Sequence, residues 1–393
     1  MNEYRYLIVG GGMTGHAAAA AIRGLDPAGS LGMIGEEPVP PYARPALSAG
    51  PWAPGADQRR FFLPALQGLV HHTGRRAVAL DPASREVVDD LGERYRYERL
   101  LLATGGAPRR LDIGGDRVIH LRTMADYERL RGHGGHCALV VGGGYVGTEL
   151  AAALAAEGRD VTMVFPEPSL GANRWPGGLS EHVTRAFEAH GVRLLRGHAV
   201  ARVEAFGDHG DRVLVRTSGG AELLADLVVA GLGTRPQTAL AEAAGLAVSD
   251  GVEVDEGLRT SAPDVWAAGD VARVWSPALG ERIRLEHAEN ALAMGREAGR
   301  AMAGEPVRWS QLPSWGASFF GAAYQAVGKI DARMETVEAW QRPYHEGVVY
   351  YLEHGRVKGV LLWGLAGRLE AARQLIRRQR PVGAADLQGA LER

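Results

Sequence analysis

The sequence predicts an α/β protein with two Rossmann-like modules, the second inserted in the first, followed by a C-terminal α+β domain. The modules are predicted because a glycine-rich turn between an apolar run and an alanine-rich stretch occurs near residue 10 and again near residue 142. The last domain is predicted because aromatic and β-branched segments dominate from about residue 307. We expect the first module in residues 1–110 and 240–306, the inserted module in 111–239 and the C-terminal domain in 307–393.

The composition is that of an ordinary globular protein. The 393 residues exceed what one compact core usually holds, so several domains are expected. Hydrophobic residues make up 46% and charged residues 23%, and the net charge is −2. A balance so close to neutral argues against nucleic acid or an anionic membrane as the main partner.

The chain has a single cysteine, Cys137. Neither an intrachain disulfide nor a redox-active cysteine pair can form within this sequence. No run approaches the roughly 18 apolar residues that span a bilayer. The first apolar strand begins a few residues after Met1, which leaves no room for a signal peptide. We therefore expect a cytoplasmic protein without a membrane span.

The first module begins with an apolar strand at 6–9, a glycine turn and an alanine-rich helix around 16–22. The turn has G-x-G-x-x-G spacing, formed by Gly10, Gly12 and Gly15. These glycines permit a tight turn, close approach of a pyrophosphate and packing of helix on strand. The phosphate charge then meets free N–H groups at the positive end of the helix. A second apolar run ends at Glu36, where an acid can accept ribose hydroxyls.

The segment between the two glycine turns is predicted to be antiparallel. Residues 75–102 alternate apolar and polar side chains around turn signals at 81–82 and 90–92. This excursion returns in a buried strand at 100–103.

The second module repeats the pattern of the first. A strand at 138–141 leads into a glycine turn and a helix at 148–157, and the next strand spans 160–165. The turn glycines and the distal acid have the earlier spacing: Gly142, Gly144, Gly147 and Glu167. One G-x-G-x-x-G is weak evidence, but two complete copies predict two bound dinucleotides. A carboxylate at Glu167 repels a 2′-phosphate and the next basic residue, Arg174, is seven positions away, which favours NADH over NADPH.

Further elements follow the second module. We expect an apolar strand at 223–230, closed by a turn at 231–236, and a strand and turn at 265–270. A long alanine-rich helix is expected from about 286 to 302.

Three further motifs connect the chain to a known family: Arg44-Pro-Ala-Leu-Ser48, Leu102-Ala-Thr-Gly105, and residues 260–270 with the sequence Thr-Ser-Ala-Pro-Asp-Val-Trp-Ala-Ala-Gly-Asp. Together with the glycine turns they resemble the two-dinucleotide flavoprotein reductases. Within them, the chain is similar to the ferredoxin, putidaredoxin and rubredoxin reductases and apoptosis-inducing factor. Segments 165–167 and 323–328 resemble apoptosis-inducing factor and its bacterial relatives in particular.

The resemblance implies FAD in the first module and NAD(H) in the second. It implies that Asp270, with Gly269, binds the ribityl and pyrophosphate region of FAD, although a helix N-cap is the alternative. Arg44 would contact FAD rather than lie on the surface. Glu149 and Trp315 would act beside the nicotinamide and flavin, whereas a helix-start carboxylate and a core tryptophan are the alternatives. The pair Glu286-His287 would approach the flavin ring or cap the following helix. The other cofactor-binding positions are Ala103, Thr104, Gly105, Tyr145, Val146 and Gly233.

The chain departs from the family pattern at two places. Relatives usually have a lysine after the serine at position 48, paired with the glutamate at position 149, whereas this chain has Ala49. Relatives often have Ser-Asp after the tryptophan, whereas this chain has Gly316-Ala317. Because a cation near the flavin stabilises its anionic reduced form, the departures predict a sluggish or selective reductase.

Three other groups of residues are interpreted without a ligand. His133, His136 and Cys137 form H-x-x-H-C, but without a nearby fourth ligand they are interpreted as a connector and a buried strand cysteine, so no metal is expected. The pair His71-His72 is interpreted as loop or surface. A basic segment on a predicted C-terminal helix is interpreted as a solvated face, with a docking surface for an acidic ferredoxin as the alternative: Arg368, Arg373, Arg377, Arg378 and Arg380.

Two functions follow from these observations. The leading hypothesis is a reductase that passes electrons from NADH through FAD to an external acceptor, such as an iron–sulfur protein, rubredoxin, a quinone or dioxygen. The alternative is an NADH-sensing protein like apoptosis-inducing factor, which would form a long-lived charge-transfer complex and change its dimerisation. A homodimer is compatible with both.

Overall fold

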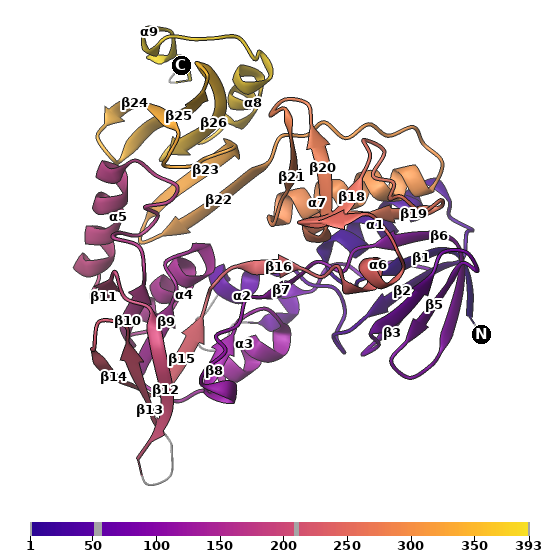
Figure 1. Ribbon diagram of the computed structural model, residues 1–393, viewed down its shortest axis with the longest axis horizontal. Helices are drawn as coiled ribbons and strands as arrows, with labels where there is room; N and C mark the ends of the chain where they lie inside the picture. The colour runs from indigo at the N-terminus through magenta and orange to yellow at the C-terminus, as the bar shows by residue number, and fades with distance from the viewer. Residues whose placement is uncertain (1, 51–56, 208–211, 392–393) are drawn as a thin grey trace. The chain divides into compact units, whose positions relative to one another are not determined.

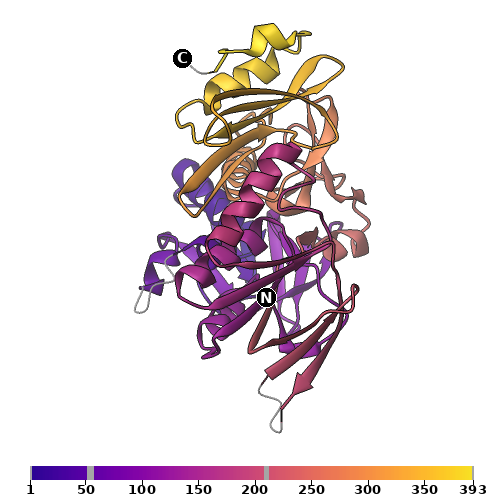
Figure 2. The same cartoon turned by 90° about the vertical axis from the view of Figure 1, so that its left-hand side faces the viewer.

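The computed structural model describes residues 2–50, 57–207 and 212–391 (Figures 1 and 2). The described chain forms two compact units. Unit 1 comprises residues 2–46, 57–107 and 234–313, and unit 2 comprises 47–50, 108–207, 212–233 and 314–391. The chain thus leaves unit 1 at residue 107 and returns at 234, as expected for an inserted module. The limits expected for three domains remain a prediction.

The main sheet of unit 1 has the strand order β3-β2-β1-β6-β5-β4, with β19 beside β6. Strands β3, β2, β1, β6 and β19 are parallel, whereas β4 and β5 pair antiparallel, which confirms the predicted excursion. Parallel strands covered on both faces need continuous apolar runs, and Leu7, Ile8, Leu100 and Leu101 are fully buried. The strands are β1 (Asn2–Val9), β2 (Leu31–Gly35), β3 (Leu69–Thr73), β4 (Ala77–Asp81), β5 (Glu86–Asp89), β6 (Arg94–Leu102) and β19 (Val265–Ala267).

The interpretation of His71-His72 as loop or surface is wrong. Both residues lie in β3, where His71 is paired in register with Met33 of β2. The His71 ring lies against the backbone of Gly11 and Gly35, because an ideal Cβ on either glycine would stand 3.0 Å and 2.8 Å from Nε2. The hydroxyl of Tyr4 lies 2.8 Å from His72 Nε2. Both histidines are therefore part of the sheet that supports the first glycine turn.

Helices α1 (Met13–Leu25) and α7 (Ala288–Met302) lie side by side in unit 1 (Figure 1). A Cβ on Gly295 or Gly299 of α7 would stand only 2.3 Å or 2.4 Å from a carbonyl oxygen of α1, so glycine permits this approach. The helix predicted from residue 286 begins at Ala288. The other elements of unit 1 are η1 (Gln58–Phe61), β7 (Gly106–Pro108), β16 (Thr234–Pro236), α6 (Ala239–Ala243), β17 (Val248–Ser249), β18 (Gly251–Val254), η3 (Gly269–Val271), β20 (Ala272–Ser276) and β21 (Glu281–Arg284).

Unit 2 contains a second parallel sheet, with the order β11-β10-β9-β15-β8. A separate antiparallel sheet has the order β12-β13-β14. The elements of this part are α2 (Ala46–Ala49), η2 (Gly115–Arg117), β8 (Val118–His120), α3 (Met124–Arg131), β9 (Cys137–Val141), α4 (Tyr145–Ala156), β10 (Asp160–Phe165), α5 (Gly177–Ala189), β11 (Arg193–Arg196), β12 (Val200–Phe206), β13 (Arg212–Thr217), β14 (Glu222–Ala225) and β15 (Leu227–Ala230).

The single strand predicted at 223–230 is wrong, because the chain forms β14 and β15 there, separated by Asp226. The Asp226 carboxylate accepts hydrogen bonds from the backbone of His136 and Cys137 at 2.9 and 2.8 Å, and from Arg212 Nε at 3.1 Å. These bonds turn the chain from one sheet into the other. Helix α4 also begins three residues before its predicted start, at Tyr145.

The C-terminal part of unit 2 is an antiparallel sheet with the order β22-β23-β26-β25-β24. Its elements are β22 (Ser314–Phe319), β23 (Ala322–Gly328), β24 (Glu335–Arg342), β25 (Glu346–Glu353), β26 (Arg356–Trp363), α8 (Leu369–Arg377) and α9 (Ala384–Leu387). Helix α5 packs against this sheet (Figure 2), with the Phe187 ring 5.3 Å from Phe319 and 4.9 Å from Phe320. The predicted strand-rich C-terminal part and the predicted α/β fold class are confirmed.

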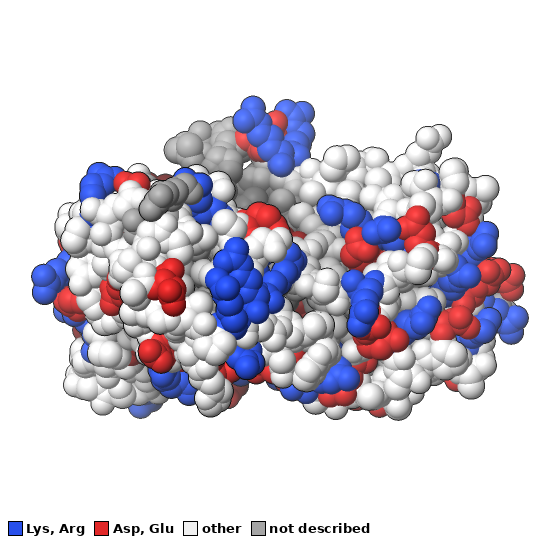
Figure 3. Space-filling view, turned by 90° about the horizontal axis from the view of Figure 1, so that it is seen from above, with Lys and Arg blue, Asp and Glu red and all other residues white. Residues whose placement is uncertain are grey.

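Charged side chains of both signs are spread over the face shown in Figure 3, in keeping with the small net charge. One arginine of the basic C-terminal segment is not part of a solvated face, because Arg373 donates to the Ser314 hydroxyl at 2.8 Å and its side chain is only 19% exposed. Among the described residues, no helix is long and apolar enough to cross a bilayer, and no three metal-ligating side chains converge.

Candidate functional site: two dinucleotide turns

The first glycine turn in unit 1 has the backbone that a dinucleotide site needs. Gly10 has a φ of +126°, and a Cβ there would stand 2.0 Å from the carbonyl oxygen of Ala103. A Cβ on Gly15 would stand 2.1 Å from the carbonyl oxygen of Gly10, so the helix packs directly on the turn. At Gly12, the N-cap of α1, a Cβ would meet no atom within 4 Å, and no side chain caps the helix. The turn therefore presents open space and uncapped N–H groups.

Residues from distant parts of unit 1 meet beside this turn. Ala103 follows β6 and donates its N–H to Val9 at 2.8 Å. The hydroxyl of Thr104 donates to the carbonyl of Gln237 at 2.8 Å, and Gln237 N–H donates to the carbonyl of Gly105 at 2.9 Å. These bonds fasten the crossover after β6. Glu36 follows β2 directly and is exposed.

The Gly269-Asp270 motif lies next to α1. A Cβ on Gly269 would stand 2.2 Å from the Thr14 hydroxyl oxygen, so the motif adjoins the first helical turn. Asp270 lies inside η3 and is not at its N-cap, Ala268. The carbonyl of Asp270 accepts from Arg284 Nη1 at 3.3 Å, and the same guanidinium contacts the Glu286 carboxylate. Arg284, which the sequence reasoning missed, thus ties Glu286 to Asp270, while the adjacent His287 is the N-cap of α7.

Arg44 is partly buried and belongs to the same unit. Its guanidinium donates to Glu37 and to the Tyr42 hydroxyl, both at 2.9 Å, and its side chain is 25% exposed. Burial disfavours its charge, whereas Tyr42, Glu37 and Asp270 favour it, and the net result is a raised pKa of Arg44. Asp270 of the Gly269-Asp270 motif thus contributes to the raised pKa of Arg44. Arg44 is therefore not a solvated surface arginine.

The second glycine turn repeats these features in unit 2. Gly142 has a φ of +108°, and a Cβ there would stand 2.5 Å from the carbonyl oxygen of Gly231. A Cβ on Gly147 would stand 2.0 Å from the carbonyl oxygen of Gly142, whereas one on Gly144 would meet nothing closer than 3.8 Å. No side chain caps α4. Gly231 was not among the predicted site residues. Its position directly after the apolar run that forms β15 could have indicated it.

Three further predicted residues of the second module, Val146, Glu167 and Gly233, lie in three different segments of unit 2. Val146 is half-buried in the first turn of α4, beside Tyr145. Glu167 follows β10 by two residues, and its carbonyl accepts from Gly197 N–H at 3.2 Å. Gly233 has a φ of +81° and accepts from Arg109 N–H at 2.9 Å, at the return of the chain toward unit 1.

Glu149 lies one turn into α4 and is bonded to Ser48. The Ser48 hydroxyl donates to the Glu149 carboxylate at 2.6 Å. Burial raises the pKa of Glu149, and the hydrogen bond from Ser48 lowers it only in part. Within the described residues, no lysine or arginine opposes this rise. The carboxyl therefore has a hydroxyl partner, whereas the family resemblance implies a cation there.

Trp315 and Tyr145 form the other contact of this region. Trp315 Nε1 donates to the Tyr145 hydroxyl at 2.9 Å, and the rings meet edge to face. Trp315 is half-exposed, so it is not a core tryptophan. Arg174 covers the Tyr145 ring, with Cζ 4.0 Å from its centroid. Tyr145, Glu149, Trp315 and Arg174 therefore gather at the beginning of α4.

The geometry fits two nucleotides with diphosphate groups. Each turn leaves space where a side chain would otherwise stand, and each has uncapped helix N–H groups that an anion satisfies. An acid follows the neighbouring strand in both modules.

Comparison with known proteins gives a consistent assignment. The family model described as pyridine nucleotide-disulphide oxidoreductase matches residues 4–295. The chain is 31% identical to monodehydroascorbate reductase 3 of Arabidopsis thaliana, over 92% of this chain and 90% of the relative. It is 33% identical to the ferredoxin reductase subunit of a 5,5′-dehydrodivanillate O-demethylase from a Sphingobium species, over 91% and 89%.

The solved structures agree. The putidaredoxin reductase in its covalent complex with putidaredoxin has a TM-score of 0.90 and 27% identity, covering 98% of this chain and 95% of that one. A ferredoxin reductase from Rhodopseudomonas palustris has a TM-score of 0.89 and 27% identity, covering 98% and 97%. With its two nucleotide turns and single cysteine, the chain belongs to the pyridine nucleotide-disulphide oxidoreductase family, as an FAD-dependent NAD(P)H oxidoreductase without a redox disulphide.

Proposed function

We propose that this protein oxidises NADH in preference to NADPH and delivers the electrons to a ferredoxin-type iron–sulfur protein. The observation that carries the proposal is the presence of two matching dinucleotide turns in a sequence with one cysteine. Without a second cysteine, electrons cannot be stored in a disulfide and must leave the flavin for an external acceptor.

The residues of unit 1 would hold FAD, which accepts a hydride from the nicotinamide and releases the electrons onward. The first turn would bind the pyrophosphate through backbone N–H groups, and Glu36 would accept the ribose hydroxyls. The residues proposed for FAD are Gly10, Gly12, Gly15, Glu36, Arg44, Ala103, Thr104, Gly105, Gly269, Asp270, Glu286 and His287.

The residues of unit 2 would hold NADH in the same manner, with Glu149 and Trp315 beside the reacting rings. Their task is to orient the nicotinamide and to exclude water from it. The residues proposed for NADH are Gly142, Gly144, Tyr145, Val146, Gly147, Glu149, Glu167 and Gly233.

The preference for NADH rests on Glu167. Its carboxylate follows β10, where an acid accepts ribose hydroxyls and repels a 2′-phosphate. Arg174 would be the nearest basic residue along the chain, but its guanidinium is stacked on Tyr145. It is therefore engaged at the beginning of α4.

Two observations support an iron–sulfur acceptor. Relatives that match most of the chain include a ferredoxin reductase subunit and a putidaredoxin reductase joined to putidaredoxin. In addition, Arg377, Arg378 and Arg380 are exposed at the end of α8 and beyond it. Such a basic surface steers an acidic partner and makes its association rate dependent on salt.

The test follows electrons from nucleotide to acceptor. FAD-loaded protein is mixed with NADH or NADPH, and flavin bleaching is followed by stopped-flow absorbance. Reduced protein is then offered an acidic ferredoxin, a rubredoxin, a quinone or dioxygen. Fast, salt-dependent oxidation by ferredoxin is expected, with slower oxidation by the others. Faster oxidation by the quinone or dioxygen would contradict the proposed acceptor.

The alternative is an NADH sensor. It is favoured by Ala49 and by the pair Gly316-Ala317, which lack the charged and polar side chains that the family resemblance implies there. A sensor would keep a charge-transfer complex for minutes and change its size on reduction. Gel filtration with and without NADH, run beside the turnover assay, separates the two functions. Rapid turnover at constant size supports the reductase, and slow turnover with a new dimer supports the sensor.

A further inference from the structure

Arg174 lies in the connection between β10 and α5, where hydrogen bonds hold its backbone. Its N–H donates to the carbonyl of Gly171 at 2.8 Å, and its carbonyl accepts from the Tyr351 hydroxyl at 2.8 Å. The next residue, Trp175, is buried against Gly171, where a Cβ would stand 2.2 Å from the indole. The backbone of Arg174 is therefore fixed on both sides.

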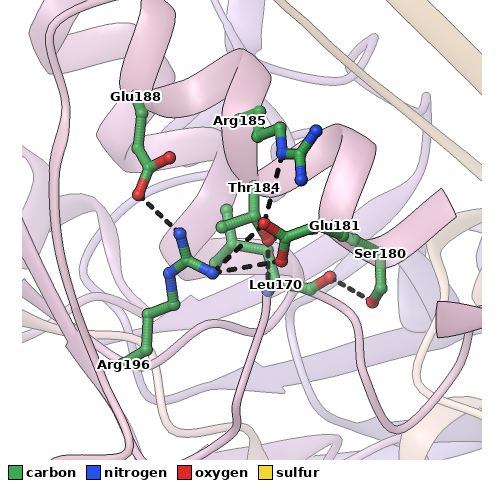
Figure 4. A network of polar contacts seen from close by, with 7 residues as sticks. All are labelled: Leu170, Ser180, Glu181, Thr184, Arg185, Glu188 and Arg196. Carbon is green, nitrogen blue, oxygen red and sulfur yellow. Dashed lines mark hydrogen bonds and ion pairs between the residues drawn. The ribbon is translucent and has the colours of Figure 1, made fainter. Parts of the chain in front are cut away.

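The same connection is anchored to α5 at Leu170 (Figure 4). The Ser180 hydroxyl donates to the carbonyl of Leu170 at 2.6 Å, and Leu170 N–H donates to the Thr184 hydroxyl at 2.9 Å. Ser180 and Thr184 are fully buried. These hydrogen bonds to α5 thus help to fix the backbone of the connection that contains Arg174.

The guanidinium of Arg174 is a positive charge without a carboxylate partner among the residues that the structure describes. It lies over the Tyr145 ring, with Cζ 4.0 Å from the centroid, and its Nε is buried without a hydrogen-bond acceptor. Arginine keeps its charge in any protein environment. An aromatic ring stabilises a cation without neutralising it. The positive charge of Arg174 therefore still acts electrostatically on groups near the Tyr145 ring.

The cluster at the beginning of α4 also contains one carboxyl group, that of Glu149. Glu149 lies one turn further along α4, and burial raises the pKa of its carboxyl. Both Arg174 and Glu149 influence the pKa of Tyr324 in β23, which burial raises, and no ion pair joins the two in the part of the chain that the structure describes. Within the described residues, the Arg174 charge at the beginning of α4 is therefore not neutralised by an ion pair.

We propose that Arg174 is a positioning residue that discriminates between the two forms of the nicotinamide cofactor, weakening the binding of NAD⁺ relative to NADH. This inference rests on the proposed function, which places the nicotinamide beside Tyr145 and Glu149. When NADH transfers a hydride to the flavin, the neutral dihydronicotinamide ring becomes a pyridinium cation. Repulsion from Arg174 then favours the release of the product and shortens the life of the complex between reduced flavin and NAD⁺.

The expected size of the effect follows from Coulomb's law. Two unit charges about 10 Å apart in a site of effective dielectric constant about 20 repel enough to change an affinity roughly tenfold. Because NADH has a neutral ring but the same phosphates, its affinity should change little. The signature is thus a change in the ratio of the two affinities.

The experiment uses FAD-loaded protein and two probes: NAD⁺ and tetrahydro-NAD, whose ring is neutral and cannot donate a hydride. Dissociation constants are measured by calorimetry for the wild type, Arg174→Gln, Arg174→Met and Arg174→Lys. Arg185→Gln is the matched control, because Arg185 is exposed on α5 and forms an ion pair with Glu181 of the same helix. FAD content and thermal unfolding are compared for every variant.

Both neutral variants should bind NAD⁺ about tenfold more tightly while binding tetrahydro-NAD within about twofold of the wild type. Arg174→Lys and Arg185→Gln should leave the ratio unchanged. The long-wavelength absorbance that follows reduction by one equivalent of NADH should persist longer in Arg174→Gln and Arg174→Met. Equal changes for the two probes, or an unchanged ratio, would overturn the inference while leaving the proposed function intact. A wild type that binds neither probe and is not bleached by NADH would overturn both.

Discussion

The Ser48 hydroxyl donates a 2.6 Å hydrogen bond to the Glu149 carboxylate, although the two residues lie 101 positions apart. Ser48 belongs to α2 and Glu149 to α4, so the fold brings a short segment from the N-terminal region to the second nucleotide turn. The family resemblance implies a lysine partner for this carboxylate at position 49, where this chain has alanine. A hydroxyl supplies a hydrogen bond but no charge, and the pKa of Glu149 is raised by its burial.

The raised pKa of Glu149 leads us to predict how the stability of the protein depends on pH. In the native state Glu149 keeps its proton to a higher pH than it does in the unfolded chain, so the native state binds more protons. The free energy of unfolding therefore falls as the pH rises from the ordinary glutamate range through the raised pKa of Glu149. Glu149→Gln removes this loss, and its stability relative to the wild type should increase with pH. Thermal unfolding of both proteins from about pH 4 to about pH 8 measures the difference.

Ser48→Ala provides the companion variant. It removes a hydrogen bond to a carboxylate, which should cost about 1.5 kcal/mol at neutral pH. In the Glu149→Gln background the cost should be smaller, because the amide is a neutral acceptor. A pH-independent difference between Glu149→Gln and the wild type would contradict this description of the pair.

Single alanine substitutions should distinguish the ligand of the first glycine turn from that of the second. A Cβ at residue 15 or 147 would stand about 2 Å from the carbonyl oxygen of the preceding turn glycine, so the helix must shift away from the phosphate position. Gly15→Ala should lose FAD and become colourless. Gly147→Ala should remain yellow but lose at least about tenfold in affinity for NADH.

Gly24→Ala is the control for these substitutions. Gly24 also lies in α1, but a Cβ there would meet no atom within 4 Å. The variant should keep FAD and gain about 0.5–1 kcal/mol of stability, because alanine is the better helix former. Absorbance spectra, nucleotide titration and urea unfolding check the three variants. Loss of FAD from Gly24→Ala, or full FAD in Gly15→Ala, would refute the assignment of the first turn.

A buried carboxylate in unit 1 should respond to pH in the opposite direction. Asp89 is 1% exposed and accepts from the Tyr95 hydroxyl at 2.8 Å and from the N–H groups of Leu91 and Glu93 at 3.0 and 2.9 Å. Burial opposes its charge, but these bonds and Arg75 outweigh burial and lower the pKa of Asp89. Its contribution is present above the ordinary aspartate pKa and is lost as the pH falls through the lowered pKa.

Asp89→Asn should therefore destabilise the protein at neutral pH by about 2–3 kcal/mol. Because the wild type loses the same contribution in acid, the difference should shrink as the pH approaches about 3. Urea unfolding across this range is the measurement. A difference that grows in acid would show that Asp89 is not held as a carboxylate.

Glu167 should govern the choice of nucleotide. Glu167→Gln removes the negative charge that disfavours a 2′-phosphate, and kcat/KM for NADPH should rise about tenfold relative to NADH. Glu128→Gln is the matched control, since Glu128 is an exposed acid on α3 of the same unit. Initial rates with both nucleotides and ferricyanide as acceptor measure the ratio. An unchanged ratio in Glu167→Gln would place the ribose recognition elsewhere.

The sequence alone determined the two nucleotide turns, most strands and the strand-rich C-terminal part. The reason is that these features are local. A turn such as Gly10–Gly15 needs glycines at fixed spacing, because the backbone conformation and the close approach of strand to helix depend on residues only a few positions apart. A parallel strand buried on both faces likewise needs an apolar run that is visible in the sequence.

The tertiary structure decided which distant side chains meet. Asp226 divides one apolar run into two strands because its carboxylate binds the backbone of His136 and Cys137, about ninety residues earlier. Ser48 reaches Glu149, and Arg174 reaches Tyr145, through contacts that no short-range pattern encodes. The energy of such pairs depends on burial and on the absence of competing charges. Both are properties of the folded chain, which spacing along the sequence does not specify.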